Sequence, residues 1–205
     1  MRLIFDYGGT VIDEVDETEY TRMLDVSEGH PVPYPGYIAY KAFSLGLLDT
    51  VDEYITVLSR LTGVPEERCR EYLDERVAAP TLDSEVRQTL ERLSDDHELV
   101  LFTDQVKPWI DEALDSFGIS DLFEDVVVSS EIAKEKPHPK GYVRAIDGRD
   151  DAVMVSDELN DDLLMADYFG ATTVWIQNSY EEVVEEPDYR IDDVTEVEEI
   201  VEGLE

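Results

Sequence analysis

Short apolar runs alternate with stretches of helical periodicity over most of this chain, and this alternation constrains the fold more than any other feature. Such runs, each next to an amphipathic stretch, indicate strands that are buried on both faces and joined by helices. The expected strands are 3–5, 99–102, 126–128, 152–155 and 172–176, and helices are expected at 83–93, 108–118, 142–146 and 163–169. The sequence therefore predicts an α/β fold with a Rossmann-like parallel sheet.

The first expected strand ends in an aspartate and a glycine turn, Asp6-Tyr7-Gly8-Gly9-Thr10. The carboxyl ends of strands are where open α/β sheets bind ligands. Glycines at such a turn let backbone amides and carbonyls come close to a ligand. Asp6 is therefore the leading candidate for a carboxylate that reacts with a substrate or binds one.

After the first strand, the chain leaves the sheet and returns only beyond residue 80. A crossover between parallel strands needs only about a dozen residues with a helix, so a module is inserted here. Its pattern is helical at 36–48, at 51–61 behind a capping box that starts at Thr50, and at 65–77, with a proline-rich connector at 30–35. We therefore expect a core made of 1–13 and 80–205 and a small α-helical domain made of 14–79.

The acidic stretch that begins at Glu181 keeps apolar residues at regular spacing. Its last part is expected to form a helix that is capped by Thr195 and packs on the core through Val201 and Leu204. The sequence thus predicts a docked helix at this end rather than a free tail.

The chain is extremely acidic. It has 16 Lys and Arg against 51 Asp and Glu, which gives a formal net charge of −35. Hydrophobic residues make up 42% of it, and their periodicity from end to end argues against disorder. Because the acids are scattered, they favour adaptation to high salt over one acidic recognition surface. Dense counterions would screen the self-repulsion, since the Debye length is about 3 Å at 1 M salt. We therefore expect a protein from a halophile.

The same charge balance makes nucleic acid an unexpected partner, because phosphate backbones require a basic face. The single cysteine, Cys69, has no second cysteine to pair with inside the chain, which fits a reducing compartment. The sequence shows no leader pattern and no apolar run of the roughly 18 residues that span a membrane. We therefore expect a soluble, cytoplasmic protein, and the pattern leaves its oligomeric state open.

Further polar groups follow Asp6 in a defined order. Thr103 follows an expected strand, Lys136 lies in the sequence Lys-Pro-His-Pro, and Asp157 with Asp162 follows another expected strand. The order is a carboxylate, a hydroxyl, an ammonium group and a late acidic pair. This order resembles the motifs of the haloacid dehalogenase-like hydrolase superfamily. The resemblance spans nearly the whole chain. It implies that the inserted helices are a cap of the C1 type, which closes over the substrate.

The resemblance implies a role for each acidic motif. Asp6 would be the nucleophile that attacks phosphorus and forms an aspartyl phosphate. Mg²⁺ would offset the charge of the two anions, held by Asp6, by the backbone carbonyl of Gly8 and by Asp157. Asp162 would orient metal-bound waters or the lysine. Magnesium is therefore the expected cofactor.

Substrate binding is assigned by the same resemblance to Thr103, Lys136 and Gly9. The Thr103 hydroxyl would hold a phosphoryl oxygen, and the Lys136 ammonium group would hold the transferring group. The prolines on either side of His138 stiffen the loop that aims Lys136. The expected function is that of a Mg²⁺-dependent phosphatase acting on a small phosphorylated metabolite.

Two positions depart from the family's pattern. Most phosphatases of the family carry a second aspartate two residues after the nucleophile as general acid and base, and this chain has Gly8 there. The residue after Thr103 is usually Asn in the family and is Asp104 here. Acid–base catalysis is typically worth about 10²- to 10⁴-fold, so the first departure matters. The candidates for a replacement acid are Asp13, Glu14, Asp16 and Asp104, and a substrate with a good leaving group would need none.

Alternative functions therefore stay open beside the phosphatase. One is a low-activity or non-catalytic homologue that binds a metabolite. Another is a haloacid dehalogenase-type hydrolase, which needs no metal and usually has Tyr at the position of Gly8, whereas Tyr7 stands one residue earlier here. A third is cleavage of a carbon–phosphorus bond through an imine on a cap lysine, for which Lys41 is the candidate.

Overall fold

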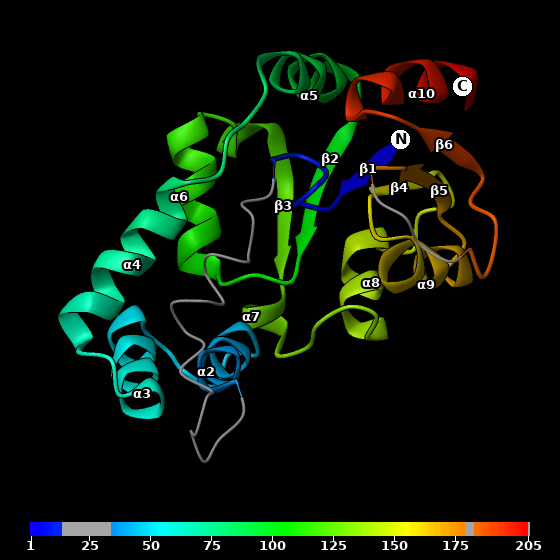
Figure 1. The fold of residues 1–205 in the computed structure, drawn as a ribbon. Helices are drawn as coiled ribbons and strands as arrows, with labels where there is room; N and C mark the ends of the chain where they lie inside the picture. Colours follow the sequence, from blue (N-terminus) through cyan, green and yellow to red (C-terminus); the bar gives the residue numbers. More distant parts are fainter. Residues whose placement is uncertain (14–33, 179–182, 205) are drawn as a thin grey trace.

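The computed structural model describes residues 1–13, 34–178 and 183–204. In these ranges, six parallel strands form one sheet in the order β3-β2-β1-β4-β5-β6 (Figure 1). The strands are β1 (Arg2–Phe5), β2 (Glu98–Thr103), β3 (Phe123–Val128), β4 (Ala152–Ser156), β5 (Thr172–Ile176) and β6 (Tyr189–Ile191). The predicted α/β fold with a parallel sheet is confirmed.

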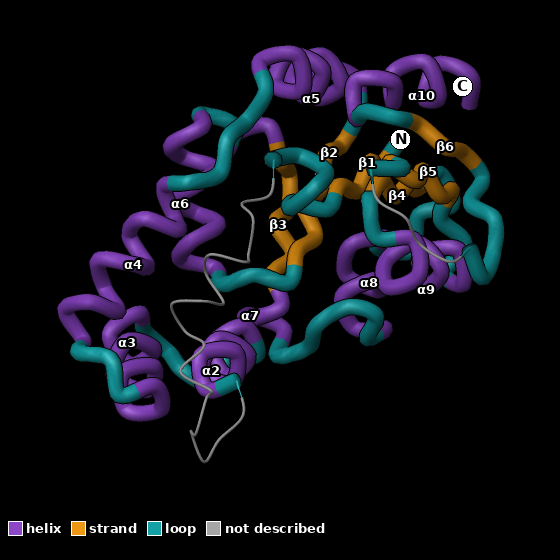
Figure 2. Tube along the Cα trace, in the orientation of Figure 1, coloured by secondary structure: helices purple, strands orange, loops and turns teal. Residues whose placement is uncertain are grey.

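Helices cover both faces of the sheet (Figure 2). They are α2 (Pro35–Ser44), α3 (Val51–Thr62), α4 (Glu66–Ala78), α5 (Ser84–Asp96), α6 (Lys107–Phe117), α7 (Ser129–Ile132), α8 (Pro139–Ile146), α9 (Leu164–Tyr168) and α10 (Val197–Leu204). Helices α5, α6 and α10 contribute buried side chains to one core cluster, and α8 and α9 contribute to the other. The sheet is therefore the middle layer of three.

The strands alternate their side chains between these two clusters. In β1, Leu3 and Phe5 face the first cluster and Ile4 faces the second. Both kinds of position are fully buried, which explains why the strands read as continuous apolar runs. Each buried leucine, isoleucine or phenylalanine side chain stabilises the fold by about 1.5–3 kcal/mol relative to exposure.

The register of the central strands sets the position of the site. Phe5 of β1 pairs with Leu101 of β2 and with Val155 of β4, so these three strands end at nearly the same level. The backbone N–H of Asp6 still donates to the carbonyl of Val155, at 3.0 Å. The residues that follow the three strands are therefore gathered at one edge of the sheet.

Helices α2, α3 and α4 lie between β1 and β2 in the chain and stand beside α6 (Figure 1). Their apolar side chains share a buried cluster with Val106 and Trp109, which belong to the start of α6. The two ends of the inserted segment meet, because the N–H of Asp13 donates to the carbonyl of Thr81 at 3.1 Å. The division into domains at 13 and 80 stays a prediction. Of the proline-rich connector predicted at 30–35, residues 30–33 lie outside the described residues, and Pro35 is the first residue of α2.

Local capping explains several helix boundaries. The Thr50 hydroxyl accepts a hydrogen bond from the N–H of Glu53 at the start of α3, as the sequence predicts. Asp83 caps α5 in the same way, and Gly118 ends α6 in the left-handed conformation. These boundaries were predictable because the capping residue and the apolar spacing agree.

The acidic C-terminal stretch differs from the prediction. A sixth strand, β6, lies between the acidic run and the helix, and Ile191 is its one buried side chain. The predicted Thr195 cap is wrong: Asp193 caps instead, accepting from the N–H of Thr195 and forming a capping box with Glu196. Val201 is buried as expected, but Leu204 is 38% exposed. A strand of three residues with one buried side chain is too short to show the alternation of apolar and polar residues that indicates a strand in a sequence.

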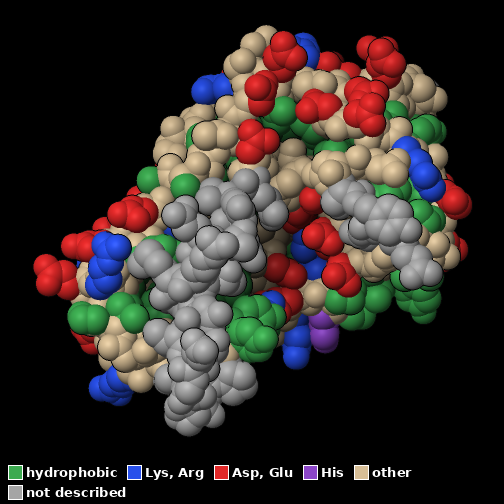
Figure 3. Space-filling view, viewed as in Figure 1, with side chains coloured by type: hydrophobic (Ala, Val, Ile, Leu, Met, Phe, Trp, Pro, Cys, Tyr) green, Lys and Arg blue, Asp and Glu red, His purple; other side chains and the backbone are tan. Residues whose placement is uncertain are grey.

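Acidic side chains are spread over the face of the protein that Figure 3 shows, and the chain as a whole has 51 acids against 16 bases. Described ion pairs such as Arg92–Glu198 and Arg144–Asp125 lie at exposed or partly exposed positions, where a pair contributes about 0–1 kcal/mol. Even if each of the 16 bases paired with one of the 51 acids, 35 carboxylates would have no basic partner. None of the helices in the described ranges is long and apolar enough to cross a lipid bilayer.

We expect the folded state to need salt. Dilution from molar to millimolar KCl lengthens the Debye length and restores repulsion among the unpaired carboxylates. The melting temperature should fall by about 10 °C or more, which is about 3–5 kcal/mol for a chain of this size. Thermal unfolding followed by circular dichroism checks this, with sorbitol as an uncharged control. A melting temperature that does not change with KCl would contradict the predicted adaptation to high salt.

Candidate active site

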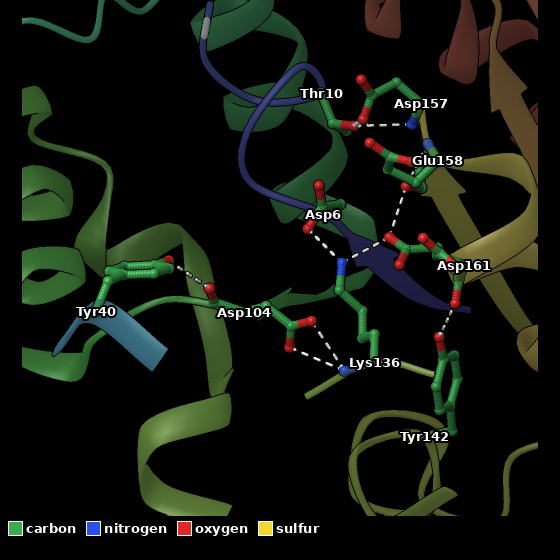
Figure 4. A network of polar contacts seen from close by, with 11 residues as sticks. Asp6, Thr10, Tyr40, Asp104, Lys136, Tyr142, Asp157, Glu158 and Asp161 are labelled. Atoms are coloured by element: carbon green, nitrogen blue, oxygen red, sulfur yellow. Dashed lines mark hydrogen bonds and ion pairs between the residues drawn. The ribbon is translucent and has the colours of Figure 1, made fainter. Parts of the chain in front are cut away.

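Asp6 stands directly after β1 at the carboxyl edge of the sheet. It is 7% exposed, and its Oδ1 accepts a hydrogen bond from the Lys136 ammonium group at 2.6 Å. The two residues are 130 positions apart in the chain and come from different loops of this edge (Figure 4). The structure therefore brings the predicted nucleophile and the predicted lysine into direct contact.

The Lys136 side chain is buried between two carboxylates. Its Nζ lies 2.6 Å from Asp6 Oδ1 and 2.6 Å from Asp162 Oδ2. Burial on its own lowers the pKa of this lysine, but the charges of Asp162 and Asp6 outweigh burial and hold the pKa well above its usual value. Lys136 is therefore a fixed positive charge beside Asp6.

Asp162 is the second carboxylate that holds the lysine. It is 1% exposed, and its Oδ2 also accepts a hydrogen bond from the Ser156 hydroxyl at 2.7 Å. Burial raises its pKa to about 7, against the opposing effect of Lys136. A buried carboxylate with two donors is positioned to orient the lysine rather than to meet a substrate.

Asp157 follows β4 and is held by hydrogen bonds from its side chain and its backbone. Its Oδ1 accepts from the Thr10 hydroxyl at 3.4 Å and its Oδ2 accepts from the Asn178 amide at 3.2 Å. Its own N–H donates to the Thr10 oxygen at 3.2 Å, and its carbonyl accepts from the Trp175 indole at 2.9 Å. Burial first, and then the charge of Asp6, raise the pKa of Asp157.

Gly9 is required by the close approach of this carboxylate. Its φ of +67° lies in the left-handed region, and a Cβ at this position would stand 2.1 Å from Asp157 Oδ2. A side chain at residue 9 would therefore displace Asp157 from the site.

The residues at this edge fit a hard divalent cation. Asp6 and Asp157 offer carboxylate oxygens, and the charge of Asp6 disfavours ionisation of Asp157, which a cation would relieve. No group of three or more His, Cys, Asp or Glu side chains within the described ranges is arranged to hold a metal ion. A site here would therefore need oxygen ligands from the backbone, such as the expected Gly8 carbonyl, and from water.

Thr103 is the last residue of β2 and is 2% exposed. Among the described residues, no hydrogen bond of its hydroxyl joins it to Asp6 or Lys136. Its position at the end of β2 places it at the same edge as Asp6, one residue beyond the level of Asp6 in the parallel register. Its contact with substrate stays a prediction.

Asp104 faces the lysine loop. Both of its carboxylate oxygens accept from the N–H of Lys136, at 3.0 and 2.9 Å, and its own carbonyl accepts from the Tyr40 hydroxyl at 3.1 Å. Burial raises its pKa to about 6. Asp104 thus anchors the backbone of the lysine loop.

Of the other candidates for a replacement acid, the described residues include only Asp13. Asp13 is exposed, and its carboxylate accepts from the Thr81 hydroxyl at 3.3 Å. Glu14 and Asp16 lie outside the described residues.

Tyr7 is buried in the first core cluster, where burial raises its pKa to about 12, so it does not take the place of the dehalogenase tyrosine.

Lys41 is part of the contact between the inserted helices and the core. Its ammonium group pairs with Glu135 at 2.9 Å, and the Ser44 hydroxyl donates to the same carboxylate at 2.6 Å. Burial lowers the pKa of Lys41, but the hydrogen bond and charge of Glu135 raise it overall. A lysine that forms imines needs a lowered pKa, so this geometry disfavours carbon–phosphorus cleavage through Lys41.

Several residues of the network were not identified from the sequence. They are Thr10, Ser156, Asn178 and Glu135, each a common polar residue in a loop or at a strand end. The position of Thr10 in the first motif could have indicated it. Nothing in the local sequence indicates Asn178, because its partners are distant in the chain.

The structure gathers two carboxylates and a buried lysine at the carboxyl edge of a parallel sheet, beside inserted helices. This arrangement is typical of a hydrolase built on a Rossmann-like core. The family model for haloacid dehalogenase-like hydrolases matches residues 2–170. The chain belongs to this family, as its motifs predict.

Individual relatives add detail. Over 109 residues, the chain is 35% identical to a glyceraldehyde 3-phosphate phosphatase from Methanopyrus kandleri, covering 48% of this chain and 46% of that protein. The chain spans about half the length of the curated relatives it matches.

Two solved structures share the fold over almost their entire length. A 2-haloacid dehalogenase from Pseudomonas syringae pv. Tomato DC3000 has a TM-score of 0.68 at 18% identity, covering 100% of this chain and 99% of that one. A phosphatase of the family from Thermococcus onnurineus has a TM-score of 0.66 at 23% identity, covering 98% of each chain. Dehalogenase and phosphatase thus share this architecture, so the fold alone does not choose between them.

Proposed function

We propose that the protein is a Mg²⁺-dependent phosphatase of a small phosphorylated metabolite and that Asp6 is its nucleophile. The observation that carries the proposal is the buried Lys136 ammonium group, held at 2.6 Å from both Asp6 and Asp162. A fixed cation beside a nucleophilic carboxylate lowers the repulsion that an incoming phosphate meets. The curated relatives, named as glyceraldehyde 3-phosphate phosphatases, support this substrate class.

The geometry supports a reaction in two steps. One Asp6 oxygen attacks phosphorus, so that a carboxylate–phosphorus bond forms while the ester oxygen–phosphorus bond breaks, and water then hydrolyses the acyl phosphate to free Asp6. Lys136 neutralises charge on Asp6 and the phosphoryl group, while Asp162 keeps the ammonium group in place. Thr103 and Gly9 would hold phosphoryl oxygens. Mg²⁺, held by Asp6, Asp157 and the Gly8 carbonyl, would supply the further positive charge that two anions need in order to meet.

The leaving oxygen lacks an obvious proton donor in the described part of the chain. Gly8 has no side chain, and Asp104 is turned to the backbone of Lys136. This observation favours, as a second candidate, a homologue of low turnover that binds its metabolite without releasing phosphate efficiently. It also favours substrates with good leaving groups.

The phosphatase proposal predicts release of inorganic phosphate from glyceraldehyde 3-phosphate and related sugar phosphates when Mg²⁺ is present. Chelation by EDTA should lower the rate by about 100-fold or more, because charge stabilisation by a metal is worth several kcal/mol. The measurement is a phosphate-release assay in molar KCl, run beside a halide-release assay on 2-chloropropionate. Halide release that continues in EDTA, without phosphate release, would instead establish a dehalogenase.

A further inference from the structure

Asn178, in the loop that follows β5, joins two parts of the site that are distant in the chain. Its Nδ2 amide donates to the carbonyl of Gly9 at 3.0 Å and to Asp157 Oδ2 at 3.2 Å. An asparagine amide carries two N–H donors, so one is available for each acceptor. A single side chain therefore ties the glycine turn after Asp6 to the carboxylate at the end of β4.

The Asp157 carboxylate has little freedom in this arrangement. Its Oδ2 is confined between the Asn178 amide and the Cα of Gly9, where even a Cβ would stand 2.1 Å away. Its Oδ1 is 3.4 Å from the Thr10 hydroxyl. An ionised carboxylate has about four lone-pair sites, so both oxygens keep capacity for a cation.

Asn178 carries no charge, and this matters as much as its position. The amide is neutral, so it supports Asp157 without competing with a cation for it. Its two N–H groups hold the Gly9 carbonyl and Asp157 Oδ2 at 3.0 and 3.2 Å, so the amide fixes both by geometry alone.

We propose that Asn178 is a positioning residue of the Mg²⁺ site, which fixes the Asp157 carboxylate and the Gly8–Gly9 backbone in the orientation that lets them bind one cation together with Asp6. The inference rests on the proposed function, because it takes Asp6 and Asp157 to share Mg²⁺. Hydrogen-bond partners of metal ligands typically change metal affinity by about 10- to 100-fold.

The test is a calorimetric titration of the full chain with Mg²⁺ alone, in molar KCl. Asn178→Ala removes both donors, and its affinity for Mg²⁺ should fall by about 10-fold. Asn178→Leu keeps a similar size but has no donor and no charge, and its affinity for Mg²⁺ should also fall by about 10-fold. The control is Gln177→Leu, the same kind of change at an exposed neighbour, whose affinity should stay within about threefold of the parent. Circular dichroism and the melting temperature confirm that each variant is folded.

Kinetics separate positioning of the metal from damage to the nucleophile turn. With saturating Mg²⁺, the kcat of Asn178→Ala should return to within about threefold of the parent, because only metal binding is weakened. Parent-like Mg²⁺ affinity in both Asn178 variants would overturn the inference and leave the proposed function standing. A parent protein that binds no Mg²⁺ would overturn the proposed metal site itself and the inference with it.

Discussion

Replacing Asp6 with asparagine is expected to abolish phosphate release, lowering kcat by about 10⁴- to 10⁶-fold, as removal of a nucleophile does in covalent catalysis. The amide of Asn keeps the shape of the side chain but does not form an acyl phosphate. Lys136 keeps its second partner, Asp162, at 2.6 Å, so the loop should stay in place. The measurement is phosphate release under saturating Mg²⁺, with acid-quench trapping of labelled phosphate on the protein.

The matched control for this variant is Asp95→Asn, an exposed acid near the end of α5. It removes the same charge far from the carboxyl edge of the sheet and should leave kcat within about twofold, since exposed substitutions change little. If Asp6→Asn retained a tenth of the parent activity, or still trapped labelled phosphate, another residue would have to be the nucleophile.

Installing an aspartate at position 8 is expected to raise turnover of alkyl phosphates by about 10²- to 10⁴-fold, the usual contribution of general acid–base catalysis. Gly8 is partly exposed and, unlike Gly9, has no positive φ, so a side chain is tolerated by its backbone. The gain should be small for aryl phosphates, whose leaving oxygen needs no proton. The measurement is kcat for one alkyl and one aryl phosphate in the parent and in Gly8→Asp.

Gly8→Asn is the control, since it adds a side chain of the same shape without an acid. An equal gain in Gly8→Asn would show that the effect is packing rather than proton transfer. No turnover in either form would favour the second candidate, a protein that binds its metabolite without hydrolysing it.

The fold was predictable from the sequence wherever burial was continuous. Strands β1, β2, β4 and β5 have both faces buried, so each appears as an uninterrupted apolar run ending near a polar residue. Asp6, Thr103 and Asp157 each follow an expected strand, and the resemblance to the family implied that they share one site. Strand β6 was missed because it is short and mostly exposed.

The candidate site was less predictable, because tertiary contacts select among many similar side chains. The sequence offers 51 acids, and pattern alone does not show that Asp104 anchors the lysine loop or that Glu135 meets Lys41. Asn178 has acceptors 169 and 21 positions away, and only the folded sheet brings them into reach. The resemblance indicated the motif residues, while the residues that hold them in place are selected by tertiary contacts that leave no local pattern.

The aromatic cluster around Trp109 has a consequence for protein engineering. Tyr40 of α2 stacks on this ring, and Phe43 of α2 and Tyr54 of α3 meet it edge-on, with ring centroids at 5.4 and 5.5 Å. Glu135 also binds α2, because it accepts a hydrogen bond from the Ser44 hydroxyl. A chimera that grafts a foreign insert onto this sheet would leave that indole without its neighbours. A chimera that exchanges the inserted helices should therefore also exchange the core residues that contact them, at positions 109 and 135.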